Sequence, residues 1–202
     1  MSTAPRPRNR RGQGDRLRAE LLAAATDLLD AGCVVTLRSV ARKTGVAPPS
    51  IYPHFPDQQA ILLAVARQGY TELVSRLRFA ASVKDSRQRL HAICWAYLDY
   101  AQAHPHRYRA MALPGNEVSR LLTDSLAACA ATGYSTTQNP AADAIALWLG
   151  LHGLAHQRAV TRFQPWPADI AHRVTTALAR LNPDRSGVTE TPLRSVFRRP
   201  GG

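Results

Sequence analysis

The sequence predicts an all-α fold, with a small N-terminal domain followed by a larger helical C-terminal domain. Apolar residues recur at helical spacing along most of the chain, and no run alternates apolar and polar residues for long enough to form a strand. Proline and glycine stand where helices would begin or end. With 202 residues, the chain is long enough to bury an apolar core without disulfides.

The first helix is expected over residues 15–31. Leu17 and Leu21 share one face of it, and Gly32 follows at a C-cap position. The preceding residues 1–14 are rich in Pro, Arg and Gly, as are residues 183–202. Such segments bury too little apolar surface to fold, so both are expected to be loose tails, the first of them basic.

Two short helices follow. The hydroxyl of Thr36 can cap the first, and Gly45 ends it because glycine readily takes a positive φ. A third helix is expected from Pro48, while Pro53 and Pro56 prevent a long continuation. The spacing therefore predicts a helix, a glycine turn and a second short helix.

Later helices are predicted by their caps. Asp57 can cap a fourth helix, so residues 63–84 are expected to form a connecting helix and a linker. A fifth begins near Asp85 and ends at Pro105. Further helices are expected at about 116–132, 140–162 and 167–181. The segment 141–151 is apolar nearly all round, which predicts burial in the core or against a second subunit.

The composition limits the class of partner. Lys and Arg number 26 against 14 Asp and Glu, a net charge of +12, which favours a polyanion. No N-terminal apolar signal region and no run of roughly 18 apolar residues is present, so we expect a soluble cytoplasmic protein without a membrane partner. Cys33, Cys94 and Cys129 have no metal or redox spacing, which favours reduced, mostly buried thiols.

Residues 36–55 have the length and punctuation of a helix-turn-helix. Val40 and Ile51 belong to its small core, while the outward positions carry groups suited to phosphates and base edges. The motif predicts binding to double-stranded DNA. The candidate contacts are Thr36, Arg38, Ser39, Arg42, Lys43, Pro48, Pro49, Ser50, Tyr52 and His54.

The stretch TLRSVARKTGVAPPSIYPHF, followed by PDQQAILLAV, resembles the DNA-binding region of the tetracycline-repressor (TetR) family of transcriptional regulators. The resemblance spans residues 16–73. It implies that the helix from Pro48 enters the major groove and that Tyr52 and His54 approach the phosphate backbone. Gln58 stands where many members have a lysine, which removes a phosphate contact that the Arg-rich tail can offset.

The recognition helix has no Arg, Asn or Gln for a bidentate contact with a purine. Pro48 and Pro49 are therefore expected to touch thymine methyl groups, and Arg38 is the best candidate for reading a guanine. Phe55 is expected to close the small core. Tyr52 is expected to pack its ring and turn its hydroxyl toward DNA.

In the second half, RLHAICWAYLDYAQAHPHRYRAMA and LWLGLHGLAH resemble the C-terminal ligand-binding domain of a TetR subgroup named for a Trp-His-Gly motif. The resemblance covers residues 85–181 and implies a helical bundle that holds a small molecule and pairs with its twin. Aromatic and soft side chains suit such a pocket, although each could instead be plain core. The candidates are Trp95, Tyr97, Tyr100, Met111, Trp148 and His152.

Other chemistries fit less well. His152 and His156 have zinc-binding spacing, but Gly153 stands where a metalloprotease helix needs glutamate, so packing is favoured and no metal or cofactor is expected. A small helical enzyme would need a nucleophile elbow, a phosphate loop or paired carboxylates, none of which the sequence contains. A basic architectural or RNA-binding protein would explain the charge but not the apolar helices of the second half.

Together these patterns predict a DNA-binding domain at 15–62 and a ligand-binding and dimerisation domain at 85–182. The chain is expected to act as a homodimeric repressor that an unknown small-molecule effector releases from a palindromic operator. Pairing through the helices from Pro140 and Pro167 would place two recognition helices about 34 to 36 Å apart.

Overall fold

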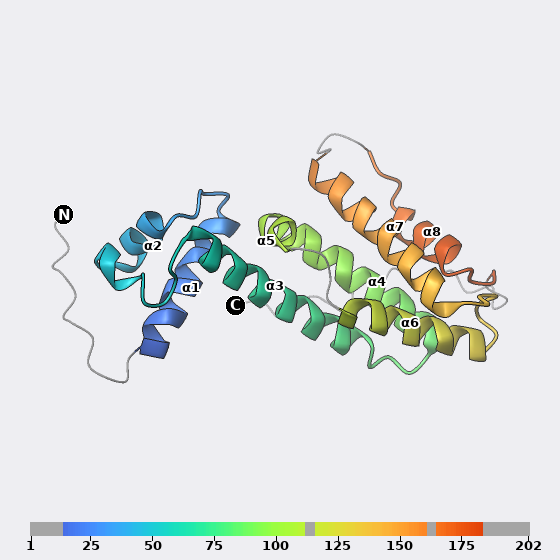
Figure 1. Cartoon of the computed structure of the whole chain (residues 1–202). Helices are drawn as coiled ribbons and strands as arrows, with labels where there is room; N and C mark the ends of the chain where they lie inside the picture. The colour runs from blue at the N-terminus through green and yellow to red at the C-terminus, as the bar shows by residue number, and fades with distance from the viewer. Residues whose placement is uncertain (1–13, 112–115, 161–164, 184–202) are drawn as a thin grey trace, which may run out of the picture.

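The computed structural model describes residues 14–111, 116–160 and 165–183 (Figure 1). These residues form eight α-helices and one short 3-10 helix without a strand, which confirms the all-α prediction. Apart from Gly14 and Pro183, the tails expected at 1–14 and 183–202 lie outside the described residues.

The N-terminal domain consists of α1 (Gly14–Asp30), α2 (Leu37–Thr44), the 3-10 helix η1 (Pro48–Ser50) and the start of α3. Gly45 ends α2 with a φ of 68°, the left-handed conformation that glycine accepts at low cost. A compact apolar core joins these elements. Its fully buried members include Leu21, Val40, Ile51 and Ile61.

Helix α3 (Gln58–Ala80) connects the two domains as one continuous helix. The carboxylate of Asp57 accepts a hydrogen bond from the Ala60 amide at 2.7 Å and so caps it, as the sequence predicts. Val65 packs in the N-terminal core, whereas Leu77 packs in the C-terminal core. The position of α3 therefore depends on both domains at once.

The C-terminal domain contains α4 (Ser86–Ala103), α5 (Pro105–Ala110), α6 (Asn116–Ala131), α7 (Pro140–Val160) and α8 (Ile170–Leu178). The helix expected to end at Pro105 ends at Ala103, and Pro105 begins the separate six-residue helix α5. Proline is well tolerated there because its missing N–H lies in the first turn of α5. Helix α8 is shorter than the predicted 167–181.

The last helices pack closely. Gly150 of α7 faces α8, and a β-carbon there would collide with the side chain of Leu178. Cys94 and Cys129 are buried free thiols, whereas Cys33 is exposed. In the part of the chain that the structure describes, no helix is long and apolar enough to cross a membrane, and no three His, Cys, Asp or Glu side chains group as metal ligands.

Candidate DNA-binding surface and its link to the C-terminal domain

The start of α2 is fixed by a reciprocal cap. The Ser39 amide donates to the Thr36 hydroxyl at 3.0 Å, and the Thr36 amide donates to the Ser39 hydroxyl at 2.8 Å. Both side chains are half-buried. The structure thus gives these two predicted DNA contacts a role inside the chain, and their contact with DNA stays a prediction.

The other predicted contacts lie on α2 and on the segment after Gly45, at the end of the molecule away from α7 and α8 (Figure 1). His54 is half-buried, and Lys43 lies 3.2 Å from Asp27 of α1. That pair is largely exposed, so it holds Lys43 only weakly. The exposed members of the set are Arg38, Arg42, Lys43, Pro48, Pro49, Ser50 and Tyr52.

The helix expected from Pro48 is a single 3-10 turn that continues as turns to His54. The Ser50 amide donates to the Ala47 carbonyl at 2.9 Å, and the Ile51 amide donates to that of Pro48 at 3.2 Å. Pro49 disfavours the α conformation of Pro48, and Pro53 has no N–H to donate to the Pro49 carbonyl, so an α-helix cannot continue through this segment. The result is a rigid apolar projection formed by the two prolines.

The expected packing of the Tyr52 ring is wrong, because Tyr52 is 57% exposed. In this tight turn Ile51 and Phe55 are almost completely buried in the core, whereas Tyr52 faces outward. The prediction that Phe55 closes the core is confirmed. The guanidinium of Arg18 in α1 lies 5.0 Å from the centre of the Phe55 ring and covers it from outside.

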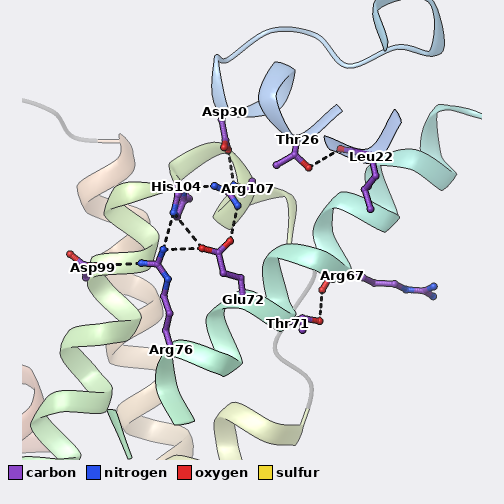
Figure 2. A network of polar contacts seen from close by, with 10 residues as sticks. All are labelled: Leu22, Thr26, Asp30, Arg67, Thr71, Glu72, Arg76, Asp99, His104 and Arg107. Atoms are coloured by element: carbon purple, nitrogen blue, oxygen red, sulfur yellow. Dashed lines mark hydrogen bonds and ion pairs between the residues drawn. The ribbon is translucent and has the colours of Figure 1, made fainter. Parts of the chain in front are cut away.

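A network of charged side chains joins the two domains (Figure 2). Arg107 of α5 donates to Asp30, at the end of α1, at 2.8 Å and to Glu72 of α3 at 2.8 Å. Only 12% of the Arg107 side chain is exposed. One guanidinium therefore connects the DNA-binding domain, the connecting helix and α5.

His104, between α4 and α5, is held between two arginines. Its Nδ1 lies 2.6 Å from Nη2 of Arg107, and its Nε2 lies 3.4 Å from Nη2 of Arg76. Burial and the Arg107 charge lower the pKa of His104, although Glu72 opposes them. Burial alone would raise the pKa of Glu72, but its bond to Arg76 and the Arg107 charge lower it. The network thus favours a neutral imidazole beside an ionised carboxylate.

Sequence reasoning missed this network. Glu72 and Arg76 have the i,i+4 spacing of a helical ion pair, which could have indicated that part. No local signal relates Asp30 to Arg107, which lie 77 positions apart.

Three of the predicted pocket residues meet in one aromatic cluster. The Tyr97 hydroxyl lies 3.0 Å from that of Tyr108, which lies 2.6 Å from Nδ1 of His152. Trp148 stacks on His152 at a centroid distance of 5.4 Å. Burial raises the pKa of Tyr97 and Tyr108 and lowers the pKa of His152, so the cluster is uncharged near neutral pH. Tyr108 was not predicted.

The remaining three candidates are Tyr100, Met111 and Trp95. A β-carbon at Gly69 of α3 would lie 3.0 Å from the Tyr100 hydroxyl and 3.5 Å from the Met111 sulfur, so these two side chains meet at α3. Trp95 is half-buried on α4. Whether any of the six contacts a ligand stays a prediction.

Helix α7 has one apolar face that the described residues leave uncovered. Leu147 and Leu151 are buried in the core, but Ile145 is 52% exposed and Leu149 is 55% exposed. The two exposed side chains are four residues apart and so share a face. Of the two explanations that the sequence left open for 141–151, the core accounts for one side of the helix only.

Two family models match the chain. A model described as bacterial regulatory proteins of the tetR family matches residues 21–65. A second, described as a tetracyclin repressor-like C-terminal domain, matches residues 90–181. The matched residues lie in the two domains between which α3 runs.

Individual proteins are also similar to this chain. The transcriptional activator FasR of Mycolicibacterium smegmatis is 35% identical over 107 residues, which is 50% of this chain and 49% of FasR. An uncharacterised regulator of Bacillus subtilis, YobS, is 26% identical over 144 residues, covering 67% of this chain and 73% of YobS. A solved structure of a protein of unknown function from Rhodococcus sp. RHA1 is 26% identical, with a TM-score of 0.70 over 81% of this chain and 94% of that one.

Proposed function

Because this chain belongs to the TetR family of bacterial transcriptional regulators, we propose that it is a homodimer that binds a palindromic operator and is released by a small-molecule effector. One observation carries the proposal. Arg38, Arg42 and the Pro48–Pro49 projection are exposed together at the free end of the N-terminal domain, on a chain with a net charge of +12.

Their arrangement suggests a division of roles. Arg38 and Arg42 are one turn apart on α2 and can reach phosphates or a guanine edge. Pro48 and Pro49 present apolar surface suited to thymine methyl groups. Tyr52 is more exposed than expected, so its hydroxyl and one edge of its ring can both approach the backbone.

The uncovered face of α7 supports pairing of two chains. Ile145 and Leu149 would be removed from water in a dimer built through α7 and α8, which stabilises association. The dimer would then set the separation of the two DNA-binding domains at about 34 to 36 Å.

The effector is proposed to act through the C-terminal domain. One predicted pocket residue supports this, because the hydroxyl of Tyr100 is buried without a hydrogen-bond partner among the described residues. Such atoms are rare in native proteins and can be satisfied by a ligand. Release would follow if the effector prefers a different spacing of the two subunits.

Selection of bound DNA from a random pool tests the proposal. We expect enrichment of one palindromic sequence, whose affinity falls steeply as salt rises from 50 to about 200 mM. Absence of enrichment, or equal affinity for unrelated duplexes, would contradict sequence-specific binding. The direction of regulation is measured separately, with a reporter gene placed after the selected sequence, because FasR is named an activator.

A further inference from the structure

A small cavity lies between α4, α5 and α7. Its volume is about 150 Å³, a size at which an apolar protein cavity can hold a benzene-sized group. The cavity adjoins the aromatic cluster, because lining residues follow or precede Tyr97, Tyr108 and His152 by one helical turn. It is open to solvent on one side and is lined by the apolar Leu98, Ala101, Pro105, Ala155 and Ala159 together with the polar Gln102 and Arg158.

Arg158 gives this apolar cavity a positive charge. Its side chain lines the cavity and is half-buried. Burial lowers the pKa of Arg158, and no carboxylate within the described residues pairs with it. Arg107, by contrast, is held by two carboxylates. A guanidinium taken partly out of water without a counter-ion costs free energy, which an anionic ligand would offset.

We propose that this cavity binds a small carboxylic acid with an apolar body, whose carboxylate pairs with Arg158 and whose body lies against Leu98, Ala101 and Ala155. The planar guanidinium matches a carboxylate in a bidentate pair. Arg158 is the one cation in the lining, whose other polar member is the neutral Gln102, and a single cation suits a monoanion better than a phosphate ester, which carries nearly two charges. The inference rests on the proposed function, since it names the chemical class of the effector.

The cavity also reaches the link between the domains. Pro105 lines the cavity and begins α5, and Arg107, two residues later, holds Asp30 of α1. A ligand that displaces α5 from α7 would therefore shift the guanidinium that anchors the DNA-binding domain.

Titration calorimetry on the full-length protein tests this proposal. The probes are benzoate, cyclohexanecarboxylate and hexanoate, each paired with its neutral primary amide. We expect at least one acid to bind, its amide to bind at least about tenfold more weakly, and Arg158→Gln to weaken acid binding by a similar factor. Arg67→Gln, an exposed arginine of α3 that points away from the network in Figure 2, should leave acid binding unchanged.

Thermal unfolding separates binding from folding. Removing an unpaired, half-buried charge should leave the Tm of Arg158→Gln equal to or above that of the parent protein. Should that variant unfold, Arg158→Lys keeps the charge but loses the bidentate geometry and should still bind the acid more weakly.

The proposal is overturned if none of the acids binds at up to about 10 mM, if acid and amide bind equally, or if Arg158→Gln binds the acid as well as the parent does. Operator binding is measured in parallel on the same protein. If the parent protein binds its operator but none of the acids, this inference alone is refuted, whereas absence of operator binding would refute the proposed function.

Discussion

Arg107→Gln is the substitution expected to weaken the link between the two domains most directly. It removes hydrogen bonds of 2.8 Å to Asp30 and 2.8 Å to Glu72. A hydrogen bond to a charged group contributes about 1.5 to 3 kcal/mol when buried, but each carboxylate is about a third exposed, so screening reduces the value. We expect a loss of about 2 kcal/mol in the free energy of unfolding.

A double-mutant cycle isolates the contact between domains. Urea unfolding is followed for the parent, Arg107→Gln, Asp30→Asn and the double variant, all at one protein concentration because a dimer unfolds by mass action. The Asp30–Arg107 coupling should be about 1 kcal/mol. Arg109→Gln is the matched control, since Arg109 lies two residues away on α5 and is exposed.

A coupling near zero would refute the structural reasoning, as would equal effects of Arg107→Gln and Arg109→Gln. Either result would mean that water satisfies Asp30 and Glu72 as well as the guanidinium does. The domains would then be joined by the apolar contacts of α3 alone.

Three further predictions follow from single residues. Burial, with the charges of His172 and Arg87, lowers the pKa of His91 to about 4. Below about pH 6.5 the unfolded chain therefore takes up a proton at this residue while the folded chain does not. The free energy of unfolding should fall by up to about 3 kcal/mol between pH 6.5 and 4. His91→Phe, which keeps the 4.8 Å ring stack on His172, should remove that part of the loss in urea unfolding at the two pH values. Leu149→Glu should convert a dimer to a monomer in sedimentation velocity and abolish operator binding, whereas Phe79→Glu, on an exposed site of α3, should do neither. Arg38→Ala should cost about 1 to 3 kcal/mol and relax one operator position, measured by fluorescence anisotropy on single-base variants; equal weakening on every sequence would show that Arg38 meets only phosphate.

Local signals made much of the fold predictable. Thr36 and Asp57 cap their helices as the sequence indicates, because a cap needs only a side-chain oxygen and an amide three residues later. Gly45 takes the positive φ expected of it. In each case the decisive contact lies within five residues, where sequence alone determines which groups can meet.

The rest depended on contacts between distant segments. Helix α4 ends at Ala103 and Pro105 begins a new helix, which packs against α1, α3 and α4, three elements that no local pattern relates to it. Tyr108 joins Tyr97 and His152 across 11 and 44 positions, so no spacing pattern relates all three. Tyr52 lies in a tight turn instead of an α-helix, and packing of Ile51 and Phe55 in the N-terminal core leaves its ring outside.

Helix α5 offers a shorter route between the effector domain and the DNA-binding domain than the long helix α3. It has six residues and is therefore less than about 10 Å long, so Pro105 at the cavity and Arg107 at Asp30 cannot move independently. Helix α3 packs in both cores along its length, and displacing it would disturb many buried contacts at once. Displacing α5 disturbs one fully packed side chain, Tyr108 with its contacts to Tyr97 and His152, and requires Arg107 to exchange its partners. Asp30 and Glu72 are accessible enough for water to replace the guanidinium. A ligand of modest affinity can supply that free energy, which is why a small cavity beside α5 is a suitable place to control the N-terminal domain.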